Sequence, residues 1–77
     1  MNEEELCRRI GDNIVFLRKH YGLSRKSLAK LINIPVGRLR RVEEGDCDIR
    51  LYDFHLKRLA RVFDVTVDSL VDEQFIH

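Results

Sequence analysis

The stretch SLAKLINIPVGRLRRVEEG, residues 27–45, contains two short segments with helical periodicity, and Asn33-Ile34-Pro35 separates them. Apolar residues in each segment recur at three- and four-residue spacing, which is typical of one face of a helix. A connection of about three residues forces consecutive helices to cross steeply, as in a helix-turn-helix. Because the second segment carries Arg38, Arg40 and Arg41, we expect the first helix to brace the second and the second to present arginine side chains.

Helix start and stop signals predict the remaining elements. Ser24 and Thr66 are good N-caps, because a hydroxyl can accept a hydrogen bond from an unpaired helix N–H, whereas Pro35 suits the first helical turn. Residues suited to the left-handed conformation that ends a helix are Gly22, Asn33 and Gly45, with Asp64 as a poorer candidate. We therefore expect an all-α fold with helices at 3–21, 24–32, 36–44, 52–63 and 67–73, in a single domain that spans residues 1–77.

Length and composition indicate one small globular domain. A chain of 77 residues can bury a single core, and it contains no run of about 18 apolar residues that would cross a membrane. The N-terminal extension, residues 1–5, is acidic and unlike a signal peptide. The two cysteines, Cys7 and Cys47, form no C-x-x-C pair, so we expect two free thiols in a reducing cytoplasm instead of a disulfide or a metal site.

Charge is distributed unevenly along the chain. The formal net charge is only +1, but residues 18–41 contain eight basic residues and no acidic one. The rest of the chain holds six basic and thirteen acidic residues, a net charge of −7. A basic face on a small domain is typical of a surface that contacts nucleic-acid phosphates, although a run of charges is more commonly a solvated helix face. The length of the acid-free window favours the phosphate-binding interpretation.

Three pieces of the sequence, LRKHYGLSRKSLAKLINI, RLRRVEEG and LKRLARVFDVTVDSL, resemble the Cro/C1-type (XRE-like) helix-turn-helix family of phage repressors and bacterial regulators. The resemblance extends over residues 10–70. Each matching residue is weak evidence alone, but the matches together, in this order and at this spacing, are strong evidence. It implies a compact five-helix, lambda-repressor-like domain with its helix-turn-helix at about residues 24–44. In this family the second helix crosses the phosphate backbone and the third enters the major groove.

The resemblance also assigns roles to individual residues. The residues that it assigns to base reading are Val36, Gly37, Arg38, Arg40 and Arg41. Among them, Val36, Gly37 and Arg41 match the family positions that lie nearest to the bases. It places at the phosphates the residues Ser24, Arg25 and Lys26, with Arg25 in place of the family's usual glutamine. It pairs Arg18 of the first helix with Glu43 of the third.

Some residues depart from the family pattern. Val36 and Gly37 have no hydrogen-bonding side chain, so Val36 would read a thymine methyl group and Gly37 would allow close backbone approach. Guanine could be read by the forked donors of Arg41, or of Arg38 or Arg40. The acidic residues that follow the expected recognition helix are Glu44, Asp46 and Asp48, and we expect them to weaken DNA binding.

These observations predict a sequence-specific regulator, with repression as the expected action, that binds double-stranded DNA by occupying an operator. The alternative is a helix-turn-helix that serves as a protein-interaction module, such as an antitoxin or an adaptor. His20, His55 and His77 are scattered without ligand spacing, so we expect no catalysis, metal, cofactor or small-molecule substrate. The expected localisation is cytoplasmic.

Several apolar residues have no clear place in a small core. We expect a homodimer through the C-terminal region, with Val71 and the tail residues Phe75 and Ile76 of segment 72–77, or through Val15 and Phe16 of the first helix. The alternative is a monomer in which the tail folds back over Val15 and Phe16. For two further aromatic residues, Tyr52 and Phe54, we expect burial, with contact to the DNA backbone or to a partner as the alternative.

Overall fold

The chain folds into five helices in the part that the computed structural model describes, residues 2–49, 51 and 53–72. The helices are α1 (Glu3–His20), α2 (Arg25–Ile32), α3 (Val36–Glu43), α4 (Asp53–Phe63) and α5 (Val67–Asp72). Their order and spacing confirm the predicted all-α, lambda-repressor-like fold, with the observed ends within one residue of the predicted ones. Residues 52 and 73, which the sequence assigned to helix ends, lie outside the described residues.

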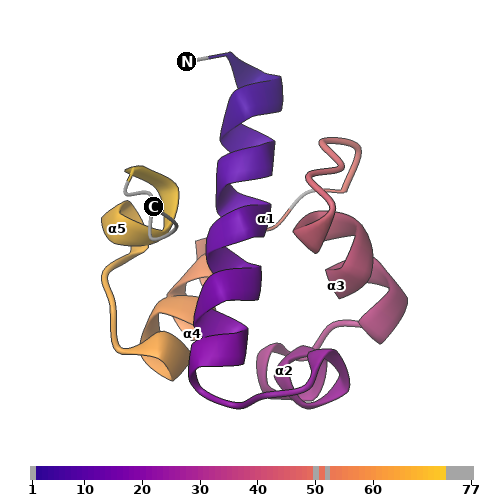
Figure 1. Ribbon diagram of the computed structural model, residues 1–77, viewed down its shortest axis with the longest axis vertical. Helices are drawn as coiled ribbons and strands as arrows, with labels where there is room; N and C mark the ends of the chain where they lie inside the picture. Colours follow the sequence, from indigo (N-terminus) through magenta and orange to yellow (C-terminus); the bar gives the residue numbers. More distant parts are fainter. Residues whose placement is uncertain (1, 50, 52, 73–77) are drawn as a thin grey trace.

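Helix α1 is the central element of the fold (Figure 1). It packs against α3 on one side and α5 on the other, while α2 packs against α3 and α4. The core is built from buried apolar side chains of all five helices: Ile14, Leu17, Leu28, Ala29, Ile32, Leu39, Val42, Leu59, Ala60, Phe63 and Leu70. No helix in the described part of the chain is both long and apolar enough to cross a membrane.

The helix ends follow the local signals of the sequence. Positive φ angles occur at all four predicted positions, Gly22, Asn33, Gly45 and Asp64. The Oγ of Ser24 accepts a hydrogen bond from the Ser27 N–H at 3.0 Å, and the Oγ1 of Thr66 accepts one from the Ser69 N–H at 3.0 Å. The placement of Pro35 in the first helical turn was wrong. Its backbone is extended, with ψ of 142°, so Pro35 is the N-cap residue immediately before α3.

Gly11 lets the backbones of α1 and α3 approach closely. A Cβ atom at this position would lie 2.5 Å from the carbonyl oxygen of Val42 and 2.9 Å from that of Glu43. Both neighbours are backbone atoms at the C-terminal end of α3. Because glycine has no Cβ atom, α1 can pack this closely against α3, the helix that carries the arginines.

The expectation of two free thiols was wrong, because Cys7 and Cys47 form a disulfide with a Cα–Cα distance of 5.6 Å. The two residues are 40 positions apart in the sequence. The packing of α1 on α3 brings the second turn of α1 beside the loop that follows α3. That proximity is a tertiary effect, which cysteine spacing does not reveal.

The expected burial of Phe54 was also wrong. Its side chain, in the first turn of α4, is 53% exposed, and the Arg58 guanidinium lies 5.8 Å from its ring centroid. Tyr52, for which we made the same prediction, lies outside the described residues.

Candidate nucleic-acid interface

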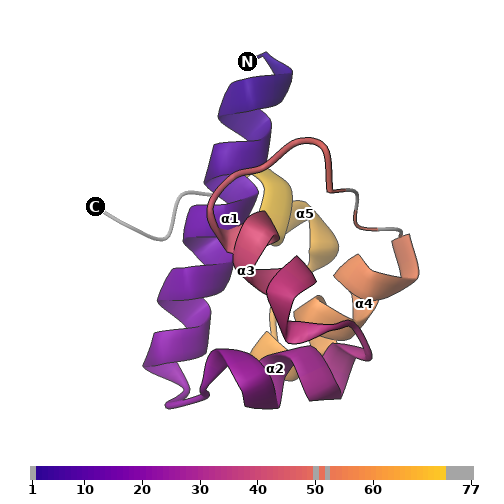
Figure 2. The same ribbon diagram turned by 90° about the vertical axis from the view of Figure 1, so that its right-hand side faces the viewer.

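The turn between α2 and α3 presents one side of α3 to solvent. Asn33 ends α2 in the left-handed conformation, and the N–H of Ile34 donates to the carbonyl of Ala29 at 3.0 Å. Figure 2 shows α3 in front of the molecule with α2 crossing below it. Because Leu39 and Val42 are buried in the core, the opposite side of α3 remains available to a ligand.

The predicted base-reading residues all lie on the exposed side of α3. Val36 is 46% exposed, and a Cβ added at Gly37 would meet nothing within 4 Å. The side chains of Arg38, Arg40 and Arg41 are exposed as well. The N-terminal end of α3 therefore offers a small apolar surface, and its middle and end offer guanidinium groups.

Two of the α3 arginines contact acidic residues that follow them. Arg40 lies 3.8 Å from Glu44, in a solvent-exposed pair of the kind that contributes little to stability. The Nε of Arg41 donates to the Oδ2 of Asp46 at 2.8 Å. From the sequence, Asp46 was expected only to weaken DNA binding, and its contact with the base-reading candidate Arg41 was not predicted.

The Asp46 carboxylate is held from two directions. Its Oδ1 accepts a hydrogen bond from the Asp48 N–H at 2.9 Å, while Oδ2 accepts from Arg41. The backbone N–H of Asp48 lowers the pKa of Asp46, and Arg41 lowers it further. Asp46 therefore remains ionised beside Arg41 at neutral pH.

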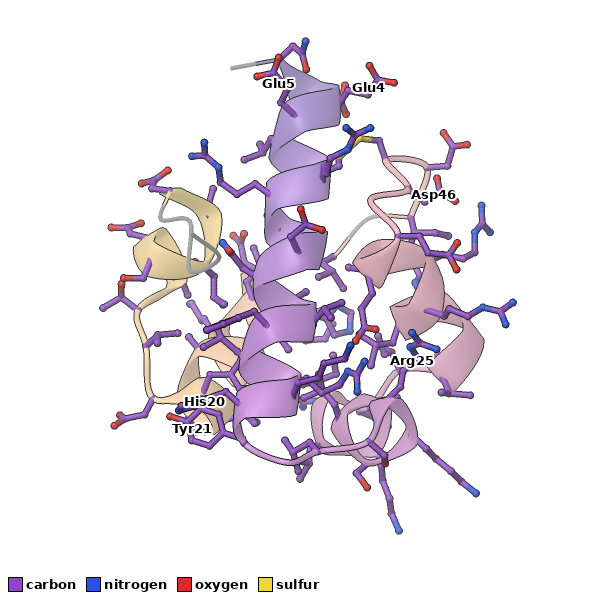
Figure 3. The ribbon with its side chains drawn as sticks, viewed as in Figure 1. Glu4, Glu5, His20, Tyr21, Arg25 and Asp46 are labelled. Carbon is purple, nitrogen blue, oxygen red and sulfur yellow. A yellow bond between two sulfur atoms is a disulfide. The ribbon has the colours of Figure 1, made fainter. Side chains whose placement is uncertain are left out.

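The predicted phosphate-contacting residues lie at the start of α2. Ser24 caps the helix, and Lys26 is exposed with no ion-pair partner among the residues that the structure describes. Arg25 is different, because its Nε donates to the Oε1 of Glu43 at 2.9 Å. Figure 3 shows Arg25 close to α3. Its side chain is still 38% exposed, so one side of the guanidinium can contact a phosphate while the other holds α3.

Arg18 and Glu43 meet in the interior and connect three helices. The Nε and Nη2 atoms of Arg18 donate to Glu43 at 2.8 and 3.3 Å, and Nη1 donates to the Leu23 carbonyl at 3.1 Å. The side chains of Arg18 and Glu43 are 10% and 1% exposed. With Arg25 as a second partner, Glu43 joins α3 to both α1 and α2. This cluster fixes the orientation of the arginine-bearing helix.

A buried histidine lies on α4 close to the arginines. His55 is 7% exposed, and its position in the sequence suggested neither a metal ligand nor any other role. Burial lowers its pKa, and the positive charges of Arg38 and Arg58 lower it further. His55 is therefore uncharged at neutral pH and adds no charge to the basic face.

The candidate dimer residues lie in two places. Val15 is half-buried on α1, and Phe16 is 39% exposed with its ring 6.3 Å from that of His20. Val71 is half-buried on α5, whereas Phe75 and Ile76 lie outside the described residues. The Leu70 and Asp72 carbonyls accept hydrogen bonds from Asn13 and Arg9, so the last turn of α5 runs toward the N-terminal end of α1 and away from Phe16.

Comparisons with known proteins agree with this arrangement. Residues 16–70 match the helix-turn-helix family HTH_3. The structure is similar to the crystal structure of the restriction-modification controller protein C.AhdI from Aeromonas hydrophila, with a TM-score of 0.73 and 25% sequence identity, over 83% of this chain and 94% of that chain. No curated protein matches the chain in sequence. Because the family match covers more than half of the chain, the protein belongs to the helix-turn-helix family of Cro/C1-type domains.

Proposed function

We propose that this protein is a transcriptional regulator that binds double-stranded DNA by inserting α3 into the major groove. The observation that carries the proposal is the exposed side of α3, where Arg38, Arg40 and Arg41 project from a helix fixed by the buried Arg18–Glu43 contact. Membership of the helix-turn-helix family and the likeness to a controller protein support a regulatory role. The expected action is repression through occupation of an operator, without chemistry.

In this proposal the two helices have different tasks. Ser24, Arg25 and Lys26 contact phosphates, which fixes the position of the domain without reading sequence. On α3, Arg41 reads a guanine through paired donors, and Val36 contacts a thymine methyl group. Gly37 permits close approach of the helix backbone to the groove. Arg38 and Arg40 contact either bases or the flanking phosphates.

Substitutions on the two helices should therefore have different effects. Lys26→Ala should weaken binding to all duplexes alike and make the dependence of affinity on salt less steep, because a phosphate contact carries no sequence information. Arg41→Ala should cost about 1–3 kcal/mol of binding and relax the preference at one base position. Fluorescence anisotropy with a panel of duplexes, each measured at several salt concentrations, separates the two effects. If neither variant changes the affinity, α2 and α3 are not the DNA-binding surface.

A second proposal concerns assembly and location. One short recognition helix reads few base pairs, so we propose a two-fold dimer on two half-sites about 34–36 Å apart. The dimer forms through Val15 and Phe16, or through Val71 with the tail residues Phe75 and Ile76. In the fluorescence anisotropy titrations, dimer formation should appear as cooperative binding to a duplex that contains two half-sites. The proposed location is the cytoplasm, where such a regulator meets DNA.

A different class of function has one specific observation in its favour. Arg40 and Arg41 are already paired with Glu44 and Asp46, so part of the positive charge on α3 is neutralised within the chain. A domain that uses this fold as an antitoxin or adaptor would tolerate that neutralisation. Such a module would bind a protein partner and show no affinity for generic duplex DNA at low salt.

A further inference from the structure

The Cys7–Cys47 disulfide lies beside the C-terminal end of α3, and its surroundings connect it to Arg41. We propose that this disulfide is a redox-sensitive regulatory element: it holds Asp46 against Arg41 and weakens DNA binding, and its reduction to two thiols raises DNA affinity. The inference rests on the proposed DNA-binding function. It assigns a role to a bond whose two cysteines lie outside the buried apolar cluster of the core.

The end of α3 fixes the backbone of Asp46. Gly45 is left-handed, with φ of 83°, and its N–H donates to the Val42 carbonyl at 3.0 Å. The N–H of Asp46 donates to the Arg41 carbonyl at 3.1 Å. Together these bonds form a Schellman motif, in which a left-handed glycine ends the helix. Asp46 therefore lies beside the last turn of α3 in either redox state.

The direction of the Asp46 carboxylate depends on the turn that follows it, residues 46–48. The N–H of Asp48 binds Oδ1, which leaves Oδ2 for Arg41, 2.7 Å from its Nη2. Cys47 is the middle residue of this turn, and the disulfide attaches it to α1. The Sγ of Cys47 also lies 3.4 Å from the carbonyl oxygen of Glu3. The disulfide thus immobilises the turn whose N–H orients the carboxylate, and Figure 3 shows Asp46 on this loop.

The contact with Asp46 opposes DNA binding in two ways. It occupies the Nε and Nη2 donors of Arg41, which a guanine or a phosphate would otherwise use. It also keeps a carboxylate charge at the end of the helix that would face the phosphate backbone. After reduction the turn is held by its own hydrogen bonds, from the Asp48 N–H to Oδ1 and from the Ile49 N–H to the Asp46 carbonyl at 3.3 Å. Without the covalent link to α1, the turn can open and the carboxylate can rotate away as Arg41 contacts DNA.

The disulfide is open to reduction by thiol–disulfide exchange. Cys7 and Cys47 are half-buried and line a pocket of about 260 Å³. A thiolate of a dithiol reductant attacks one sulfur, the S–S bond breaks, and a mixed disulfide forms. The second thiol of the reductant then displaces the protein sulfur. The protein gains two electrons and two protons as two thiols, and the reductant becomes a disulfide. Disulfides in a reducing cytoplasm are usually transient or redox-sensing, which fits this role.

The test compares duplex affinity of the intact chain in its oxidised and reduced forms, at one salt concentration. Reduction with dithiothreitol should raise the affinity of the wild type about two- to fivefold, the range that one exposed ion pair accounts for. Asp46→Asn should bind as tightly as the reduced wild type while oxidised, and reduction should add nothing further. The matched control is Asp48→Asn, which removes a neighbouring charge but keeps the backbone N–H, so its response to reduction should persist. A Cys7→Ser/Cys47→Ser variant should have the higher affinity with or without reductant.

Several outcomes would overturn the inference. One is an affinity that falls or stays constant when the wild type is reduced, and another is an undiminished redox response in Asp46→Asn. Loss of the helical circular dichroism signal on reduction would show that the disulfide only stabilises the fold. If neither form of the wild type binds duplex DNA, the proposed function itself fails, which is distinguishable from binding without redox dependence.

Discussion

Replacement of Glu43 by alanine is expected to lower the free energy of unfolding by about 3–5 kcal/mol, because it leaves the buried charge of Arg18 without its partner. The Glu43 side chain is 1% exposed and accepts hydrogen bonds from both Arg18 and Arg25. Arg25 can turn to solvent when Glu43 is removed, whereas Arg18, which is 8% exposed, cannot. Urea denaturation followed by circular dichroism measures the change.

The neighbouring residue provides a matched control. Glu44 also pairs with an arginine, but the side chains of Glu44 and Arg40 are 64% and 63% exposed. Glu44→Ala should therefore change the free energy of unfolding by less than about 0.5 kcal/mol. A double variant, Arg18→Met/Glu43→Leu, should lose much less stability than Glu43→Ala, since no charge is left buried. A double-mutant cycle without coupling would mean that the two side chains do not interact in solution.

Gly11→Ala is the second substitution for which we expect a large effect. The new Cβ would meet the carbonyl oxygens of Val42 and Glu43, which are backbone atoms and cannot rotate away. Helix α1 and helix α3 must then move apart. We expect a loss of about 3 kcal/mol, the upper end of the usual range for an overpacked interior. DNA affinity should fall as well, because the orientation of α3 depends on this contact.

Gly37→Ala is the control for the Gly11 substitution. Gly37 also lies in a helix, but a Cβ there would meet nothing within 4 Å. Alanine at this position should stabilise the chain by about 0.4–1 kcal/mol, because it restricts the unfolded chain without a clash in the folded one. Thermal denaturation of the two variants should give midpoint shifts of opposite sign. Equal shifts would show that α1 and α3 do not approach closely at Gly11.

Local features of the fold were predictable from the sequence because their causes are local. Asn33, Gly22 and Gly45 end helices through their own backbone preferences, and Ser24 caps α2 through a hydroxyl three residues from its donor. The periodicity of α3 also separates its buried residues from its exposed arginines. The sequence therefore predicted which side of α3 carries exposed arginines, while the binding of DNA by that side stays a prediction.

Features that depend on tertiary packing were not predictable in this way. The pairing of Arg18 with Glu43 was expected only because the chain resembles a family, and helical periodicity alone gives no reason for it. Cys7 and Cys47 meet only because α1 packs on α3. The Arg41–Asp46 contact needs the left-handed turn at Gly45, which reverses the chain onto the helix it has just left.

The exposure of Phe54 illustrates the same limit. Burial is the usual result for a phenylalanine, but the register of α4 turns His55, Leu59 and Phe63 toward the core instead. Their spacing of four residues defines the buried stripe of α4, and Phe54 lies outside it. When apolar residues occur on more than one side of a helix, the helices packed against it determine which of them are buried.

The affinity of the wild type for a generic duplex as a function of salt tests the central claim most directly. A domain that contacts phosphates loses affinity as salt rises, with a slope of about −0.9 in log–log form for each phosphate contacted. Arg25 and Lys26 alone would give about −1.8 per domain on this basis, and further contacts from α3 would make the slope steeper. We predict a slope of about −1.8 or steeper. Absence of binding at low salt, or an affinity that does not change with salt, would contradict the assignment of α2 and α3 to DNA.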